Sequence, residues 1–176
     1  MPQFPYAEQD RADLYLDNWN NKTTSYMAQF GNLGPVTAHG HVPNTNFTMS
    51  LANLPPHTEL RYRVYWHHVD STDGETSYLY LTNASGLETE FLRHSKVYNA
   101  LPSVSVLIGT YVWNDGRTYS YRPWGGGGYG HDGYLDYDSG YYPHGGSLFS
   151  ARHYIGEDQG SSDEAAYLSH VRVDVR

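Results

Sequence analysis

The alternation of residues 60–67 constrains the fold more than any other stretch of the chain. Its apolar side consists of Leu60, Tyr62, Val64 and Trp66, and its polar side of Arg61, Arg63, Tyr65 and His67. A period of two with one apolar side is typical of a strand that packs one face on a core. Pro55 and Pro56 lie before this strand, and an acidic loop at 70–75 follows it. The stretch therefore predicts a β-protein built around one half-buried strand.

The remainder of the chain alternates short strand-like stretches with turns. Stretches with strand character lie at 36–41, 46–51, 77–82, 104–113, 148–155 and 168–175. The 18 Tyr and 18 Gly suit a β-rich chain with many turns. No stretch shows a sustained helical repeat. We expect an antiparallel β-sandwich of the jelly-roll, concanavalin-like kind.

Several segments leave alternatives open. Residues 1–34 are expected to form an N-terminal arm or loop segment, in which 7–18 could be a short helix or an arm against a neighbour. The sandwich domain is then 35–176. Residues 88–94 could be an edge strand or a loop, and 60–67 could join 77–82 through a hairpin or a crossover. Residues 119–122 are expected to return as the hairpin partner of 104–113 after a turn at 114–116. The long Gly- and Tyr-rich loop at 123–146 is expected to be irregular through most of its length.

Composition excludes several classes of function. The formal net charge is −8, which disfavours a nucleic-acid backbone as partner. No apolar run is long enough to span a membrane. The absence of Cys rules out disulfides and thiolate metal sites. No signal-like leader follows Met1, so we expect either a cytosolic protein or a mature piece of a secreted one.

Two motifs carry a resemblance to a known family. The first is Leu-Pro-Pro-His-Thr at 54–58 with Asp-Ser-Thr-Asp-Gly-Glu at 70–75, and the second is Asp158-Gln159 followed by residues 162–173. In this order and spacing the chain resembles the jelly-roll, concanavalin-like surface modules of bacterial anchored or secreted proteins and of ciliate and algal surface proteins. Thr72 and Ala166 stand where that family has tryptophans.

The resemblance implies a sandwich fold and an extracellular setting. Modules of this family are adhesive, carbohydrate-binding or structural, and no catalytic role transfers from them. Ser169 and His170 replace an Asp-Asn pair of the family. That replacement removes a carboxylate that could have held an ion.

The acidic loops suggest a structural calcium ion, which prefers oxygen ligands from several loops. The candidate ligands are Asp70, Asp73, Glu75, Asp158, Asp163 and Glu164. The two loops could share one ion if the sheet brings them together. At opposite ends of the fold they would be solvated turns.

Aromatic residues in and near the Gly-rich loop suggest a contact surface. The candidates are Trp124, Tyr129, Tyr134, Tyr137, Tyr141 and Tyr142. Such rings could stack on sugars, with Asp132, Asp136 and Asp138 binding hydroxyls. They could instead pack in an assembly, where Tyr and Trp are favoured, or form a loop with no role.

Other sites carry weaker signals. N-glycosylation patterns begin at Asn21, Asn46 and Asn83. The pairs at 39 and 41 and at 67 and 68 are histidines, which we interpret as neutral or hydrogen-bonded side chains rather than metal ligands. No local signature holds a nucleophile beside a base, so we expect no catalysis.

The sequence favours a non-catalytic extracellular structural module. It would act as a subunit of a surface layer, filament or appendage through self-association or contact with other surface proteins. The alternative is a lectin-like domain that binds glycans for adhesion and could depend on calcium.

Overall fold

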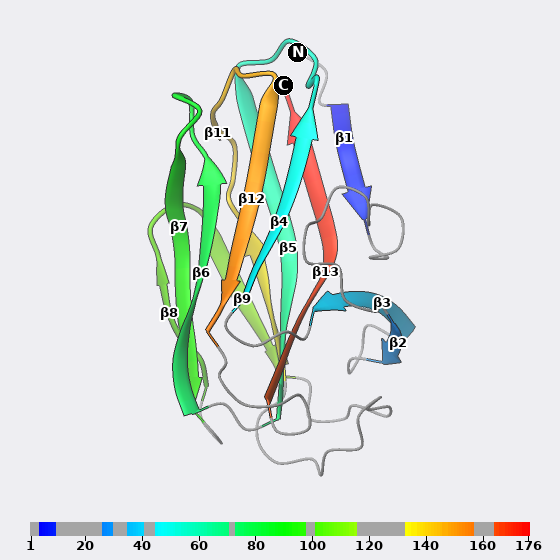
Figure 1. The fold of residues 1–176 in the computed structure, drawn as a ribbon, viewed down its shortest axis with the longest axis vertical. Coiled ribbons are helices and arrows are strands. Elements are labelled where there is room, and N and C mark those ends of the chain that lie inside the picture. Colours follow the sequence, from blue (N-terminus) through cyan, green and yellow to red (C-terminus); the bar gives the residue numbers. More distant parts are fainter. Residues whose placement is uncertain are drawn as a thin grey trace.

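Two antiparallel sheets packed face to face make up the protein (Figure 1). The computed structural model describes residues 4–9, 26–29, 35–40, 45–70, 73–97, 101–115, 133–156 and 164–176. Only strands and their connections occur among these residues. The predicted jelly-roll sandwich is confirmed. No helix capable of crossing a membrane is found within the described ranges.

The larger sheet is eight-stranded. Its main path runs β2 (Tyr26–Gln29), β3 (Pro35–Gly40), β13 (Glu164–Val175), β5 (Glu59–Asp70), β10 (Gly133–Asp138) and β9 (Thr110–Asp115). Off this path, β1 (Phe4–Gln9) pairs with β13, and β11 (Tyr142–Pro143) pairs with β5.

The smaller sheet is five-stranded. Its order is β4 (Thr45–Ala52), β12 (Leu148–Ile155), β6 (Asp73–Thr82), β7 (Glu88–Val97) and β8 (Ser103–Val106). Consecutive strands β5 and β6 lie in different sheets, so their connection is a crossover and not a hairpin.

The core lies between the sheets and is built by the alternation read in the sequence. Leu60, Tyr62, Val64 and Trp66 are fully buried on β5. Phe47 on β4, Leu79 on β6 and Phe149 on β12 are buried with them in one hydrophobic cluster. Because successive side chains of a strand point to opposite faces, the residues between them form the outer face of each sheet.

A bulge in β13 shifts its side-chain phase. The pairing with β5 is in register up to Ser169 and resumes at Arg172, and His170 has a positive φ of 52°. Leu168 before the bulge and Val171 after it are therefore both buried. Without the extra residue, one half of this strand would turn its apolar side outward.

Several predicted segments differ in the structure. Residues 104–113, expected as one strand, form β8 and β9 in opposite sheets, separated at Gly109 with a φ of 101°. Residues 88–94 lie in β7, an interior strand between β6 and β8 and thus neither edge nor loop. Residues 133–138, expected as irregular, form β10, because every second side chain there is inward and buried.

The N-terminal segment contributes strands. Residues 4–9 form β1 against β13, so the start of the suspected helix at 7–18 is extended. β2 pairs with β3. The predicted boundary between residues 34 and 35 stays a prediction. Residues 116–132, which include the rest of the predicted turn and the expected hairpin partner at 119–122, lie outside the described chain, and the partner of β9 that is described is β10.

Candidate functional site

Three tyrosines gather on the outer face of the smaller sheet. Tyr78 and Tyr80 lie on β6, where the buried Leu79 points inward between them. Tyr154 on β12 lies directly opposite Tyr78 in the strand register. The ring of Tyr78 is 6.1 Å from the ring of Tyr80, centroid to centroid, and 6.1 Å from that of Tyr154. We call Tyr78, Tyr80 and Tyr154 the tyrosine face.

Arg152 lies over one ring of the tyrosine face. It is opposite Tyr80 in the register of β12 and β6, with its guanidinium carbon 4.1 Å from the ring centroid. Its Nε donates to Glu88 Oε2 at 2.8 Å, and its Nη1 donates to Asn46 Oδ1 at 3.0 Å. Three neighbouring strands thus hold this guanidinium in one orientation, since its donors form a rigid fork.

A second arginine closes the other side of the face. Arg93 on β7 lies opposite Tyr78, with its guanidinium carbon 5.8 Å from that ring centroid. Both Nε and Nη2 donate to the carboxylate of Glu90, at 2.6 and 3.1 Å. The two arginines balance Glu88 and Glu90, so this part of a strongly acidic chain carries no net charge.

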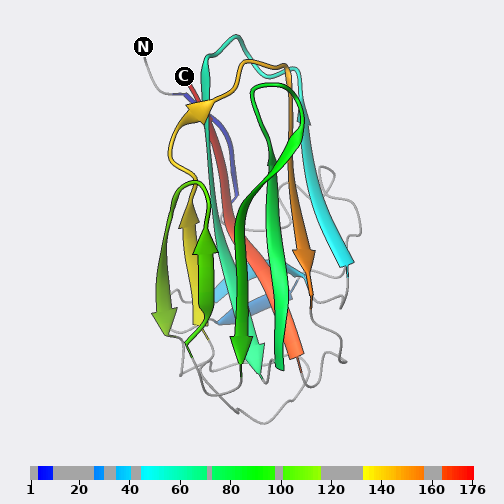
Figure 2. The same cartoon turned by 90° about the vertical axis from the view of Figure 1, so that its left-hand side faces the viewer.

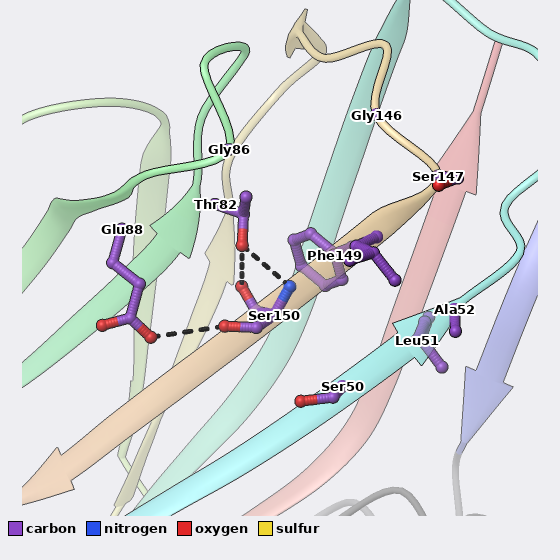
Figure 3. A pocket seen from close by; sticks show the side chains of 11 residues that line it. Ser50, Leu51, Ala52, Thr82, Gly86, Glu88, Gly146, Ser147, Phe149 and Ser150 are labelled. Atoms are coloured by element: carbon purple, nitrogen blue, oxygen red, sulfur yellow. Dashed lines mark hydrogen bonds between the residues drawn. The ribbon is translucent and has the colours of Figure 1, made fainter.

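A pocket of about 560 Å³ has Glu88, the partner of Arg152, in its wall (Figure 3). Its wall is formed by Ser50, Leu51, Ala52, Thr82, Gly86, Glu88, Gly146, Ser147, Leu148, Phe149 and Ser150. Ser150 Oγ donates to Glu88 Oε1 at 3.3 Å, and Ser150 N donates to Thr82 Oγ1 at 2.9 Å, as Figure 3 shows. Leu148 is 65% exposed and adds an apolar surface. Glu88 therefore links the pocket to Arg152.

This arrangement suits a neutral ligand rich in hydroxyl groups. Aromatic side chains offer apolar area with a polar tip, and fixed carboxylate, guanidinium and hydroxyl groups offer directional hydrogen bonds. On the outer face of the larger sheet, His67, Ser169 and Asp174 are buried, so a ligand has little access to these three side chains.

Three of the predicted calcium ligands, Asp70, Asp73 and Glu164, lie at one end of the fold. Glu164 at the start of β13 pairs with Asp70 at the end of β5, and β6 begins at Asp73. The backbone of the described chain therefore brings these three positions together. Asp158 and Asp163 lie outside the described residues, and Glu75 is half-buried on β6. No cluster of three candidate metal-binding side chains occurs among the described residues. The calcium ion stays a prediction.

The predicted aromatic surface is divided by the structure. Tyr137 and Tyr142 are core residues, with hydroxyls that donate to the carbonyls of Ile108 at 2.6 Å and Thr82 at 3.0 Å. These two cannot belong to an exposed platform. Burial raises the pKa of both phenols well above the ordinary value.

The other predicted rings have different surroundings. Tyr134 is half-buried on β10 and stacks 4.9 Å from Tyr65 on the outer face of the larger sheet. Tyr141 lies beneath the guanidinium of Arg176, 3.9 Å from its ring centroid. Trp124 and Tyr129 lie outside the described residues.

Two of the aspartates that we predicted to bind sugar hydroxyls form ion pairs with arginines. Asp138 forms an ion pair with Arg61, which lowers the pKa of that carboxyl against the opposing effect of burial. Oδ1 of Asp136 lies 3.8 Å from Nη2 of Arg63, and burial raises the pKa of the Asp136 carboxyl. Asp132 lies outside the described chain.

The predicted glycosylation sites have different settings. Asn83 Oδ1 accepts from the backbone N–H groups of Ser85 and Leu87, at 2.9 and 3.1 Å, so this side chain organises its turn. Asn46 borders the tyrosine face through Arg152. Asn21 lies outside the described residues. Occupancy at all three stays a prediction.

Several histidines lie inside the sandwich. His68 Nε2 and His94 Nδ1 lie 3.0 Å apart, and the ring of His153 packs 4.8 Å from that of Trp66. Burial lowers the pKa of His94 and of His153 to about 3, which keeps both rings neutral. His39 lies on β3, and His41 is outside the described chain.

Ser169 lies between two imidazoles. Its Oγ is 2.7 Å from His67 Nε2 and 2.9 Å from His170 Nδ1. A serine beside a histidine is the arrangement of a nucleophile with its base. However, Ser169 is only 1% exposed, and burial lowers the pKa of His67 to about 3. We therefore assign this contact to the satisfaction of buried polar groups.

Sequence reasoning missed the tyrosine face. The signal was present, because the stretch 77–82 alternates Tyr with Leu, and Arg152 and Tyr154 alternate with buried residues of β12. That alternation assigns these residues to an outer face. It does not place β6 beside β12, which are 66 residues or more apart in sequence and meet only in the sheet.

Comparisons with known proteins bear on the fold. Neither a protein-family profile nor a curated protein sequence matches the chain. Among solved structures, the K3 cleaved adhesin domain of Lys-gingipain from Porphyromonas gingivalis is similar with a TM-score of 0.50 and 10% identity, covering 98% of this chain and 100% of that one. This likeness shows the sandwich fold alone.

Two carbohydrate-related structures are similar at lower scores. The CBM22-1–GH10 modules of endo-1,4-beta-D-xylanase 10B from Clostridium thermocellum, complexed with xylohexaose, match at a TM-score of 0.47 and 11% identity, over 98% of this chain and 28% of that one. A carbohydrate-binding module with specific mannan recognition matches at a TM-score of 0.41 and 14% identity, over 100% of this chain and 99% of that one.

Proposed function

We propose that this protein is a non-catalytic, extracellular sugar-binding module. Its tyrosine face and the adjoining pocket bind a neutral oligosaccharide, with a sugar ring placed against the side of the Tyr80 ring that Arg152 does not cover and hydroxyls bonded to the Arg152–Glu88 pair. The observation that carries the proposal is this combination of three tyrosines, two internally neutralised ion pairs and a pocket on one open sheet face.

The charge balance of the face supports a neutral ligand. Each guanidinium on the face already has a carboxylate partner, at 2.8 Å for Arg152 and 2.6 Å for Arg93. An anionic ligand would have to displace Glu88 or Glu90, at the cost of an existing charge-assisted hydrogen bond. A neutral sugar can add hydrogen bonds to the spare oxygens without breaking the pairs.

A glycan array followed by titration calorimetry tests the proposal. The wild-type chain is expected to bind one class of neutral oligosaccharide, and Tyr80→Ala to weaken that binding at least about tenfold, since fully burying a large apolar side chain is worth about 1.5–3 kcal/mol. Tyr111→Ala removes a tyrosine of comparable size that is 41% exposed on β9, away from the face, and serves as control. Equal affinities for the two variants would overturn the assignment of the face.

The structural-subunit hypothesis remains a second candidate function. The observation that favours it is the uncharged stretch 101–114, described below, on the side of the sandwich at which both sheets end. The two functions are compatible, because that side and the pocket are built from different residues.

A further inference from the structure

Both sheets end on the same side of the sandwich. Within the described chain, β8 is the last strand of the smaller sheet and β9 the last strand of the larger one. The short connection 107–109 joins them, and Figure 2 shows both strands on the side of the sandwich that faces the viewer. Half of the backbone groups of an edge strand point away from its neighbour, so they are available to another strand.

Residues 101–114 on this side, which include β8 and all of β9 except Asp115, carry no charge and much apolar surface. Residues 101–114 contain no Asp, Glu, Lys or Arg in a chain with 30 such residues (11 basic and 19 acidic), and we call them the uncharged edge. Leu101 is 67% exposed, Leu107 57% and Val112 58%. Natural proteins usually protect edge strands with charged side chains, proline or a short length. The four residues of β8 include no charge and no proline, and Pro102 directly precedes them.

The uncharged edge is held in place. Leu107 N donates to Phe91 O at 2.9 Å, and Tyr137 Oη donates to Ile108 O at 2.6 Å. A Cβ on Gly109 would come within 2.4 Å of Asp138 O, so the backbone of the connection packs tightly on the end of β10. The edge is therefore preformed, which lowers the entropic cost of binding a partner.

We propose that the uncharged edge binds the same edge of a second copy of this chain, with β8 antiparallel to β8 across a two-fold axis. Two copies that each carry a formal charge of −8 repel one another over most of their surfaces. The contact meets the least opposition where the chain has no carboxylates. The smaller sheets of the two copies become one continuous sheet.

The side chains of β8 match in this arrangement. In an antiparallel pair centred on Val104, Ser103 lies opposite Ser105 of the second copy, and Leu101 lies opposite Leu107. Pro102 lies opposite Val106 and offers only its carbonyl to that pair. Val104 and Val106, which are half-buried and pack against the core, remain on the core side in both copies. A two-fold interface requires such self-complementarity. The exposed leucines at the two ends of β8 then cover each other.

Sedimentation equilibrium of the full chain tests the proposal. The wild type is expected to dimerise, and Leu107→Lys to weaken the dimer at least about tenfold, because a charge on an edge strand opposes pairing. Leu87→Lys is the matched control, since Leu87 is 66% exposed in the β6–β7 turn. A monomeric wild type, or equal association of both variants, would overturn the proposal.

Cysteine cross-linking tests the register. The chain has no native Cys, so each introduced thiol is unique. A mixture of Ser103→Cys and Ser105→Cys proteins is expected to form a disulfide-linked heterodimer on mild oxidation, and Ser103→Cys alone to cross-link far less. Equal cross-linking in both samples would overturn the register centred on Val104. Retained glycan binding by Leu107→Lys separates this contact from the proposed sugar site.

Discussion

Arg152 covers one side of the Tyr80 ring, with its guanidinium carbon 4.1 Å from the ring centroid. The same guanidinium is held by Glu88 on a second strand and Asn46 on a third. A planar cation can lie over a ring and keep its in-plane N–H groups for hydrogen bonds. The contact therefore orders both the ring and the carboxylate at the edge of the pocket.

Replacing Arg152 tests the role of its planar shape. Arg152→Ala is expected to lower the free energy of unfolding by about 1–2 kcal/mol, because a partly exposed cation–π contact is worth about 0.5–1 kcal/mol and a partly exposed ion pair about 0.2–1 kcal/mol. Arg152→Lys keeps the charge but loses the fork and should recover less than half of that loss. Urea unfolding of the wild type and the two variants measures these free energies. A lysine variant as stable as the wild type would contradict the geometric argument.

Stability is expected to fall as the solution is acidified below about pH 6.5. Burial lowers the pKa of His67, His94 and His153 to about 3 in the folded state, while the unfolded chain titrates near 6.5. Between these values the unfolded state binds more protons. Each histidine therefore removes up to about 1.4 kcal/mol of stability per pH unit on the way down, and its full contribution is present above pH 6.5.

Urea midpoints at several pH values between 7.5 and 4 check this dependence. The ion-paired Asp138 has a lowered pKa, so its own contribution is lost only at the acidic end, as pH falls below the ordinary range of a carboxyl. A midpoint that stays constant from pH 7 to pH 5 would rule out the neutral buried histidines.

Gly109 is expected to tolerate a side chain poorly. Its φ is 101°, and an added Cβ would meet Asp138 O at 2.4 Å, whereas Gly86 has a φ of 76° and nothing within 4 Å of such a Cβ. Gly86→Ala should cost about 1–2 kcal/mol, the usual penalty for a left-handed residue with a Cβ. Gly109→Ala should lower the stability by a larger amount, because the clash with Asp138 O adds to the same backbone penalty. Thermal unfolding compares them, and equal losses would show that the connection is not tightly packed.

The calcium prediction is tested by the melting temperature. If one ion bridges the acidic segments around Asp70 and Glu164, excess calcium raises the melting temperature and a chelator lowers it, because a ligand that binds only the folded state stabilises it. Asp70→Asn should reduce the difference between the melting temperatures with calcium and with chelator. Identical melting curves with calcium and with chelator would rule the ion out.

Local patterns were sufficient to predict much of the sandwich. Strand β12 spans the predicted 148–155 without a residue of difference, and the predicted alternation of β5 matches its burial. Both stretches have a strict period of two, which depends only on neighbouring residues. Strand β10 was missed because Gly-rich sequence surrounds it on both sides and conceals the alternation of Tyr134, Asp136 and Asp138 with buried residues.

Local patterns establish the β-class of the protein, most of its strands and the apolar side of each strand. The division of 104–113 between two sheets, the core position of Tyr137 and the meeting of Tyr80, Arg152 and Glu88 beside a pocket are visible only in the folded protein. Side-chain alternation is a local property of an extended chain. Which strands become neighbours depends on the combined packing of both sheets, and the candidate sites are made by those neighbours.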